Sequence, residues 1–225
     1  MKLLLFFHLL IISCNITTSN EKLSKNIYAK FMVALGEDIT NEMQCVAEFF
    51  KDPDDLKPIA LEKGSKVLLD NQELEFDPSP YPNFISERKA SEFIGKHKWT
   101  VNLGSGAKNE YEFEVAPFNI ISSIPEKIGT TDIKVECENL KSTDEVTLML
   151  SGDLSSNSEN FLEIKPQDGY FIIPKTFLEQ VDPIKLEMHF NLSRIQRISG
   201  DDYFGKGVEI EWTKVTKHYT TTVIR

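Results

Sequence analysis

Cysteine and histidine are scarce in this sequence, which has three Cys and four His among its 225 residues. The histidines lie far apart, and no HExxH or HxxxH spacing places two of them on one metal ion. Walker-type phosphate loops, GxSxG elbows and CxxC pairs do not occur either. We therefore expect no cofactor and no catalytic residue, and we interpret the chain as a non-enzyme.

A basic surplus is also absent, because 35 Asp and Glu face 25 Lys and Arg, which gives a net charge of −10. A nucleic-acid partner is not expected, since no basic face is available to replace the counterions of the phosphates. No apolar run approaches the roughly 20 residues of a transmembrane helix. The 40% hydrophobic content is typical of globular proteins and excludes a wholly disordered chain.

The N-terminus predicts export. Residues 1–13 have one lysine before a short apolar run, which is the pattern of a secretory signal peptide. The run ends in Ile11-Ile12-Ser13-Cys14, two aliphatic residues and a small residue before a cysteine. This order is typical of a lipobox, whose cysteine receives the lipid and becomes the mature N-terminus. We predict lipidation at Cys14 and anchoring to a membrane through the acyl chains.

With Asn15 following the lipobox, the N-terminus resembles that of uncharacterised lipoproteins of Bacteroidota-type bacteria. The strand-rich segment 168–174 also resembles the sequences of those lipoproteins. The resemblance implies an accessory lipoprotein of the cell envelope, facing either the periplasm or the outside, with a binding or structural role toward a glycan or protein.

Two alternatives stay open. The chain could be a secreted eukaryotic binding or effector protein in which Cys14 is incidental and the sequons at Asn15 and Asn191 carry glycans. It could also be an envelope hydrolase, which would need two carboxylates roughly 5–9.5 Å apart.

Alternation of apolar and polar residues with a period of two predicts strands along most of the chain after residue 24. Segments 97–103 and 110–115 are expected to form a hairpin. A second hairpin is expected between 161–165 and 170–173, because Asp168-Gly169 is a strong turn signal. A helical turn is expected at 176–181.

The strand spacing predicts an all-β fold of two immunoglobulin-like β-sandwich domains in tandem. We assign residues 1–13 to the signal peptide, 14–24 to a flexible lipidated tether, 25–118 to the first sandwich and 119–225 to the second. One large sandwich with a shared core is the alternative. Cys45 and Cys137 fall on inward-facing strand positions, so we expect them to be buried and free rather than paired.

Candidate binding residues are aromatic, because sugar rings dock on exposed aromatic faces and loops often carry function. Four aromatic residues fall in predicted loops: Tyr81, Phe84, Tyr203 and Phe204. Side chains of this kind also plug the ends of sandwiches. A weaker candidate is a calcium site at Asp201 and Asp202, where nearby glycines could bend a loop around the ion.

Overall fold

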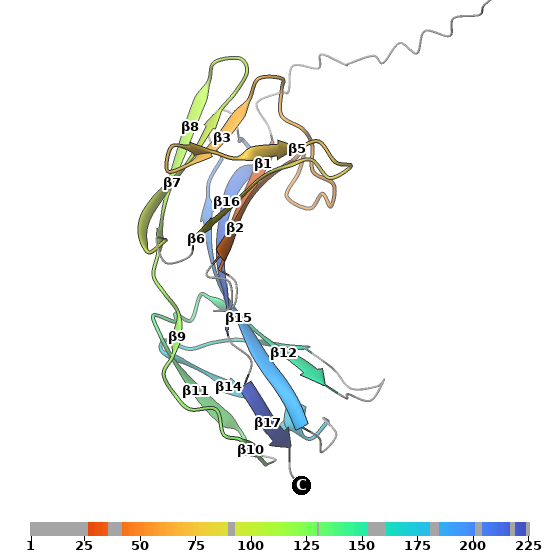
Figure 1. Ribbon diagram of the computed structural model, residues 1–225, viewed down its shortest axis with the longest axis vertical. Coiled ribbons are helices and arrows are strands. Elements are labelled where there is room, and N and C mark those ends of the chain that lie inside the picture. Colours follow the sequence, from red (N-terminus) through yellow and green to blue (C-terminus); the bar gives the residue numbers. More distant parts are fainter. Residues whose placement is uncertain are drawn as a thin grey trace, which may run out of the picture.

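The computed structural model describes residues 27–35, 42–89, 93–129, 131–152, 161–180, 185–200, 204–216 and 219–223. Nearly every element in these ranges is a strand (Figure 1). In chain order they are β1 (Tyr28–Leu35), β2 (Glu42–Phe50), β3 (Lys66–Leu69), β4 (Gln72–Glu73), β5 (Glu75–Asp77), β6 (Asn83–Lys89), β7 (Gly95–Asn102), β8 (Lys108–Val115), β9 (Asn119–Ile120), β10 (Lys127–Ile128), β11 (Ile133–Glu138), β12 (Glu145–Gly152), β13 (Phe161–Ile164), β14 (Tyr170–Ile173), the short helix α1 (Lys175–Leu178), β15 (Lys185–Ile198), β16 (Gly207–Val215) and β17 (Tyr219–Val223).

One ten-stranded sheet runs through the molecule, with the order β10-β17-β15-β16-β1-β2-β6-β5 and with β12 and β13 added beside β15. Two smaller sheets cover it. The four-stranded sheet β4-β3-β7-β8 lies over the upper part in Figure 1, and the three-stranded sheet β14-β11-β9 lies over the lower part.

Aromatic contacts join the layers of each sandwich. In the upper one, Phe31 of β1 stacks on Trp99 of β7 with ring centroids 4.9 Å apart. In the lower one, the rings of Phe171 in β14 and Phe190 in β15 meet edge to face at 5.1 Å. All four side chains are fully buried. The strands and sheets confirm the predicted all-β class. The contacts between their layers confirm the predicted tandem arrangement of two β-sandwiches.

Strands from both predicted domain ranges pair within the large sheet. β16, which belongs to the range 119–225, lies parallel to β1 over its full length, from Tyr28↔Gly207 to Leu35↔Lys214. β15 pairs with β12 and β17 in the lower sandwich and with β16 in the upper one. The division after residue 118 stays a prediction, and the sheet itself is continuous across the two ranges.

The hairpin predicted at 97–103 and 110–115 is confirmed, since β7 and β8 are antiparallel neighbours. The hairpin predicted around Asp168-Gly169 is wrong, because β13 pairs with β12 whereas β14 pairs with β11 in another sheet. Hydrogen bonds to residues distant in the sequence, rather than the local turn signal, determine the pairing of these strands. Gly169 N donates to Leu140 O at 2.9 Å, and Ser142 N donates to the Asp168 carboxylate at 2.8 Å. The turn therefore carries the chain from one layer of the sandwich to the other.

Both cysteines that the structure describes are buried and free, which confirms the prediction for Cys45 and Cys137. Burial raises the pKa of each thiol to about 11, so neither is a thiolate at neutral pH. Among the described residues no helix has the length and apolar character needed to cross a membrane.

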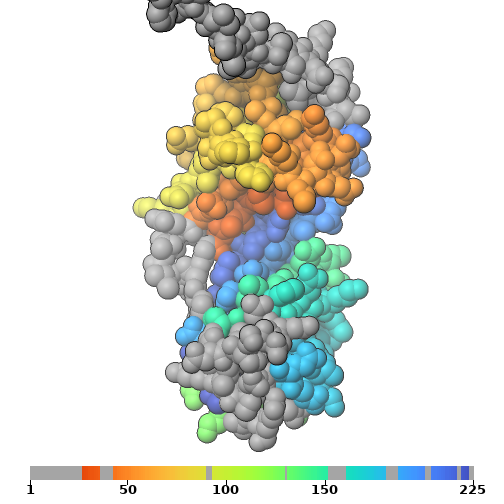
Figure 2. Space-filling model, turned by 90° about the vertical axis from the view of Figure 1, so that its right-hand side faces the viewer, coloured from red at the N-terminus to blue at the C-terminus, as the bar shows by residue number. Residues whose placement is uncertain are grey.

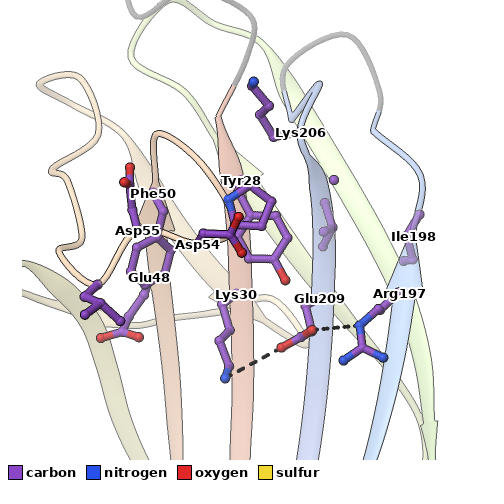
Figure 3. Close-up of a pocket in the computed structure, with 14 residues that line it drawn as sticks. Tyr28, Lys30, Glu48, Phe50, Asp54, Asp55, Arg197, Ile198, Lys206 and Glu209 are labelled. Carbon is purple, nitrogen blue, oxygen red and sulfur yellow. Dashed lines mark hydrogen bonds and ion pairs between the residues drawn. The ribbon is translucent and has the colours of Figure 1, made fainter.

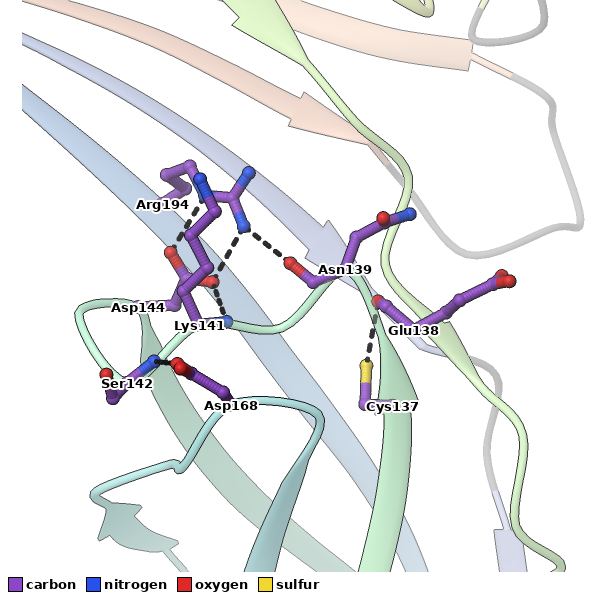
Figure 4. A network of polar contacts seen from close by, with 8 residues as sticks. All are labelled: Cys137, Glu138, Asn139, Lys141, Ser142, Asp144, Asp168 and Arg194. Carbon is purple, nitrogen blue, oxygen red and sulfur yellow. Dashed lines mark hydrogen bonds and ion pairs between the residues drawn. The ribbon is translucent and has the colours of Figure 1, made fainter.

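A salt bridge stabilises the junction between the sandwiches (Figure 4). The guanidinium of Arg194 in β15 donates to both oxygens of Asp144, over 2.8 and 2.9 Å, and to Asn139 O over 2.6 Å. The Asp144 side chain is fully buried. The guanidinium also lies over the rings of Phe118 and Trp212, at 5.3 and 5.8 Å from their centroids. One arginine thus joins the 139–144 turn of the lower sandwich to the connection between the two.

We expect Arg194→Ala to destabilise the protein by roughly 3 kcal/mol, because it leaves the buried Asp144 carboxylate without its counter-charge. Lys66→Ala is the matched control, since it breaks the exposed pair with Glu73 and should cost no more than about 0.5 kcal/mol. Urea denaturation of the three proteins measures both effects. Equal losses for the two variants would contradict the role given to Arg194.

Candidate functional site

Of the four aromatic residues proposed as ligand contacts, Tyr81 alone is both described and exposed, with 61% of its surface accessible. It lies in the proline-rich connection between β5 and β6. Tyr203 and the proposed calcium ligands Asp201 and Asp202 lie outside the described residues. Tyr81 therefore stays a candidate contact.

Phe84 and Phe204 require a correction, because both are buried in the core of the upper sandwich, at 5% and 0% exposure. Phe84 belongs to β6 rather than to a loop, and its ring lies 6.0 Å from that of Phe49. Phe204 also packs on Phe49, at 5.8 Å, and meets Tyr111 at 5.9 Å. Their rings fill space between the layers and present no face to a ligand.

His97 is a structural histidine. Its ring is buried, stacks on Phe93 with centroids 3.6 Å apart and places Nδ1 2.7 Å from a carboxylate oxygen of Asp70. Asp70 and Asn71 adopt positive φ angles of 51° and 65°, which is the geometry of a type I′ turn between β3 and β4. The turn thus fixes both Asp70 and the ring that it binds.

The main candidate site is a groove of about 620 Å³ on the outer face of the large sheet, which we call the outer groove. Its floor contains a row of charged side chains from four neighbouring strands (Figure 3). Strand register places Arg197 of β15 opposite Glu209 of β16, Glu209 opposite Lys30 of β1, and Lys30 opposite Glu48 of β2. The signs alternate along the row, an arrangement that stabilises adjacent strands.

Ion pairs fix the first three members of this row. Glu209, which is 9% exposed, accepts Arg197 Nε at 3.1 Å and lies 3.6 Å from Lys30 Nζ. Lys30 Nζ also lies 3.2 Å from Glu211. Burial alone would lower the pKa of Lys30, but the two carboxylates outweigh it and raise this pKa overall. Lys30 is therefore charged, and it is paired with Glu209 and Glu211.

Tyr28 adds an aromatic ring to the floor. It lies between Gly207 and Phe50 in the register, and the Tyr28 and Phe50 rings are 6.4 Å apart. Gly207 has a φ of +109°, which disfavours any other residue there. Burial, the charge of Glu209 and a hydrogen bond to Glu209 raise the pKa of Tyr28 to about 12. The phenol is therefore neutral at physiological pH.

The 51–58 turn forms one wall of the groove. It closes on itself through bonds from Asp55 N to Asp52 O and from Asp52 N to the Asp55 carboxylate, both 3.1 Å long. Lys206 Nζ lies 2.9 Å from the Asp52 carboxylate and ties this turn to the segment before β16. Leu56 is 94% exposed on the same wall. Figure 2 shows this orange segment standing out beside the red and blue strands of the sheet.

The outer groove combines charged side chains with apolar ones. No group of three or more metal-ligating side chains occurs among the described residues. All three cations that line the groove, Lys30, Arg197 and Lys206, are held in ion pairs. Glu48 and Asp54 have no ion pair within the described ranges, so the free charge in the groove is negative.

A second hollow, of about 700 Å³, lies at the junction between Glu114 and Arg194 on one side and Lys141 and Asp168 on the other. Its principal polar groups serve the fold, because Arg194 binds Asp144 and Asp168 binds Ser142 N (Figure 4). We therefore regard it as part of the junction.

No protein-family model and no curated protein matches this chain. Among solved structures, tandem Ig repeats of Dlar match at 12% identity and a TM-score of 0.28, covering 88% of this chain and 97% of the other. A trimodular GH5_4 endoglucanase matches at 13% identity and 0.31, covering 83% and 35%. The Bacteroides ovatus protein SGBP-B, in complex with a mixed-linkage heptasaccharide, matches at 10% and 0.23, covering 78% and 52%.

We expect Phe204→Ala to destabilise the protein by about 3–5 kcal/mol, because it empties a fully buried aromatic site. Tyr81→Ala should change stability by less than about 0.5 kcal/mol, since it removes an exposed ring. Thermal or urea denaturation compares the two. A small loss for Phe204→Ala would show that its ring is not part of the core.

The Tyr28 phenol should lose its proton at a higher pH than an ordinary tyrosine. Its pKa in the folded protein, about 12, exceeds the ordinary value of 10.0, so stability due to the neutral phenol is present below pH 10 and is lost between pH 10 and 12. The unmodified protein should lose more stability over this interval than Tyr28→Phe. Glu209→Gln should move the ultraviolet titration of Tyr28 toward pH 10. An unchanged titration in Glu209→Gln would contradict the hydrogen bond.

Proposed function

We propose that this chain is an exported lipoprotein, anchored through Cys14, that binds a glycan or protein of the cell envelope without catalysing a reaction. The outer groove is its ligand site. The observation that supports binding most directly is the charged floor, where ion pairs hold Lys30, Glu209 and Arg197 in place before any ligand arrives. Binding to side chains that are already ordered avoids part of the entropy cost of association.

The anchor is supported by the sequence alone. Residues 11–14 lie outside the described part of the structure, and their order of two aliphatic residues, serine and cysteine fits a lipobox. The segment between Cys14 and β1 is polar, which suits a tether. The outer groove begins at Tyr28, close to the end of this tether in the sequence.

One observation disfavours the secreted glycoprotein alternative. Of its two sequon residues, Asn15 lies outside the described residues, and Asn191 lies in the middle of β15, opposite Thr147 of β12 on one side and Val215 of β16 on the other. The side-chain oxygen of Asn191 is inaccessible to solvent. A glycan on this amide would have to leave from the interior of the sheet face, whereas acceptor asparagines are normally on exposed surface.

The test is the intact mass of the mature protein after expression in a bacterium that processes lipoproteins. We expect a chain that begins at Cys14 and carries acyl groups, and we expect Cys14→Ala to lose both the acyl mass and the membrane association. Cleavage at another bond, with Cys14 unmodified, would overturn the lipoprotein proposal and favour secretion.

A further inference from the structure

The unpaired charges of the outer groove indicate whether its ligand is cationic or anionic. Lys30, Arg197 and Lys206 are each held by a carboxylate within 3.6 Å. Glu48 and Asp54 have no such partner among the residues described, and both face the groove. An anionic ligand would meet these two carboxylates without a free cation to compensate. A cationic ligand would instead complete the row, because Glu48 ends it with an unmatched negative charge.

Apolar surface beside these carboxylates favours a cation that also carries an apolar part. Leu56 is 94% exposed on the wall, and Tyr28 and Phe50 contribute aromatic surface to the floor. Lysine and arginine side chains combine an alkyl stem with a charged end, so they can cover apolar groups while reaching a carboxylate. An ammonium or guanidinium group can also lie against the Tyr28 ring.

The length of the groove suits an extended peptide. Its floor crosses β15, β16, β1 and β2, and neighbouring strands lie about 4.8 Å apart, so the row spans roughly 14 Å. At about 3.3 Å per residue, four or five residues of extended chain cover this distance. A segment of that length can extend from Glu48 along the row, and Asp54 and Leu56 line the same groove.

We propose that the outer groove binds an extended segment of a partner protein that carries lysine or arginine next to an apolar residue. Glu48 and Asp54 receive the cationic side chains, and Leu56 receives the apolar one. The Lys30–Glu209–Arg197 row supports the site as a rigid floor. This inference rests on the proposed function only in placing the ligand in the outer groove, and it does not require lipid on Cys14.

The experiment measures fluorescence anisotropy of a labelled pentapeptide that alternates lysine and leucine, with the mature chain beginning at residue 14. A glutamate–leucine pentapeptide and spermine are the comparison ligands. The test variant is Glu48→Gln with Asp54→Asn. The control is Glu126→Gln with Glu163→Gln, which removes the same charge from exposed positions in the lower sandwich. Equal melting temperatures confirm that both double variants are folded.

We expect the lysine peptide to bind and the groove variant to lose about tenfold in affinity, equivalent to about 1.4 kcal/mol. The control variant should change affinity less than twofold. Equal losses in the two variants would reduce the effect to non-specific charge attraction and overturn the proposal. Equal binding of the glutamate peptide, equal binding of spermine, or no binding of the lysine peptide at 1 mM would also overturn it.

The chain's own Lys22 and Lys25 are a second source of cationic side chains, so a Lys22→Ala, Lys25→Ala variant is measured in parallel. We expect unchanged affinity, and a gain would identify the chain itself as the occupant instead of a partner. The mass of the mature N-terminus distinguishes failure of the peptide site from failure of the lipid anchor. Lipid on Cys14 without peptide binding would contradict the peptide site alone. Peptide binding without lipid would contradict the lipid anchor alone.

Discussion

Both sandwiches depend on β15, a strand of 14 residues that runs through the whole length of the described sheet. Its first half pairs with β12 and β17, and its second half pairs with β16. β16 and β17 follow one another along the same edge, and Thr216 bridges them by exchanging hydrogen bonds of 2.9 Å with the backbone of Phe190. A hinge between the sandwiches would have to break this ladder, so the sheet itself holds their relative orientation.

The junction and the outer groove use the same strand on two adjacent stretches. Arg194 points to the junction and binds Asp144, whereas Arg197, three residues later, belongs to the groove and binds Glu209. Successive side chains of a strand alternate between faces, so an odd separation directs these two guanidinium groups to opposite sides. The floor of the groove is therefore built on the segment that the Arg194–Asp144 pair anchors.

Local patterns predicted much of the fold but little of the groove. Alternation identified β7 and β8, where Trp99, Val101, Tyr111 and Phe113 are buried on one face. The same reasoning failed at Asp168-Gly169, because a hydrogen bond from Gly169 N to Leu140 O and one from Ser142 N to the Asp168 carboxylate direct that turn between layers. The groove was not predicted, because Lys30, Glu48, Arg197 and Glu209 become neighbours only through the register of four strands. Phe84 and Phe204 were assigned to loops, and three-dimensional packing makes them core.

The position of the groove limits where its ligand can come from in the proposed lipoprotein. The residues between Cys14 and Ile27 can span at most about 45 Å even when fully extended. Tyr28 and Lys30 follow at once, so the outer groove lies at the end of the molecule nearest the anchor, and the lower sandwich extends away from it (Figure 1). If Cys14 carries the proposed lipid, the length of this segment sets the greatest distance from the membrane at which a partner can meet this end of the groove.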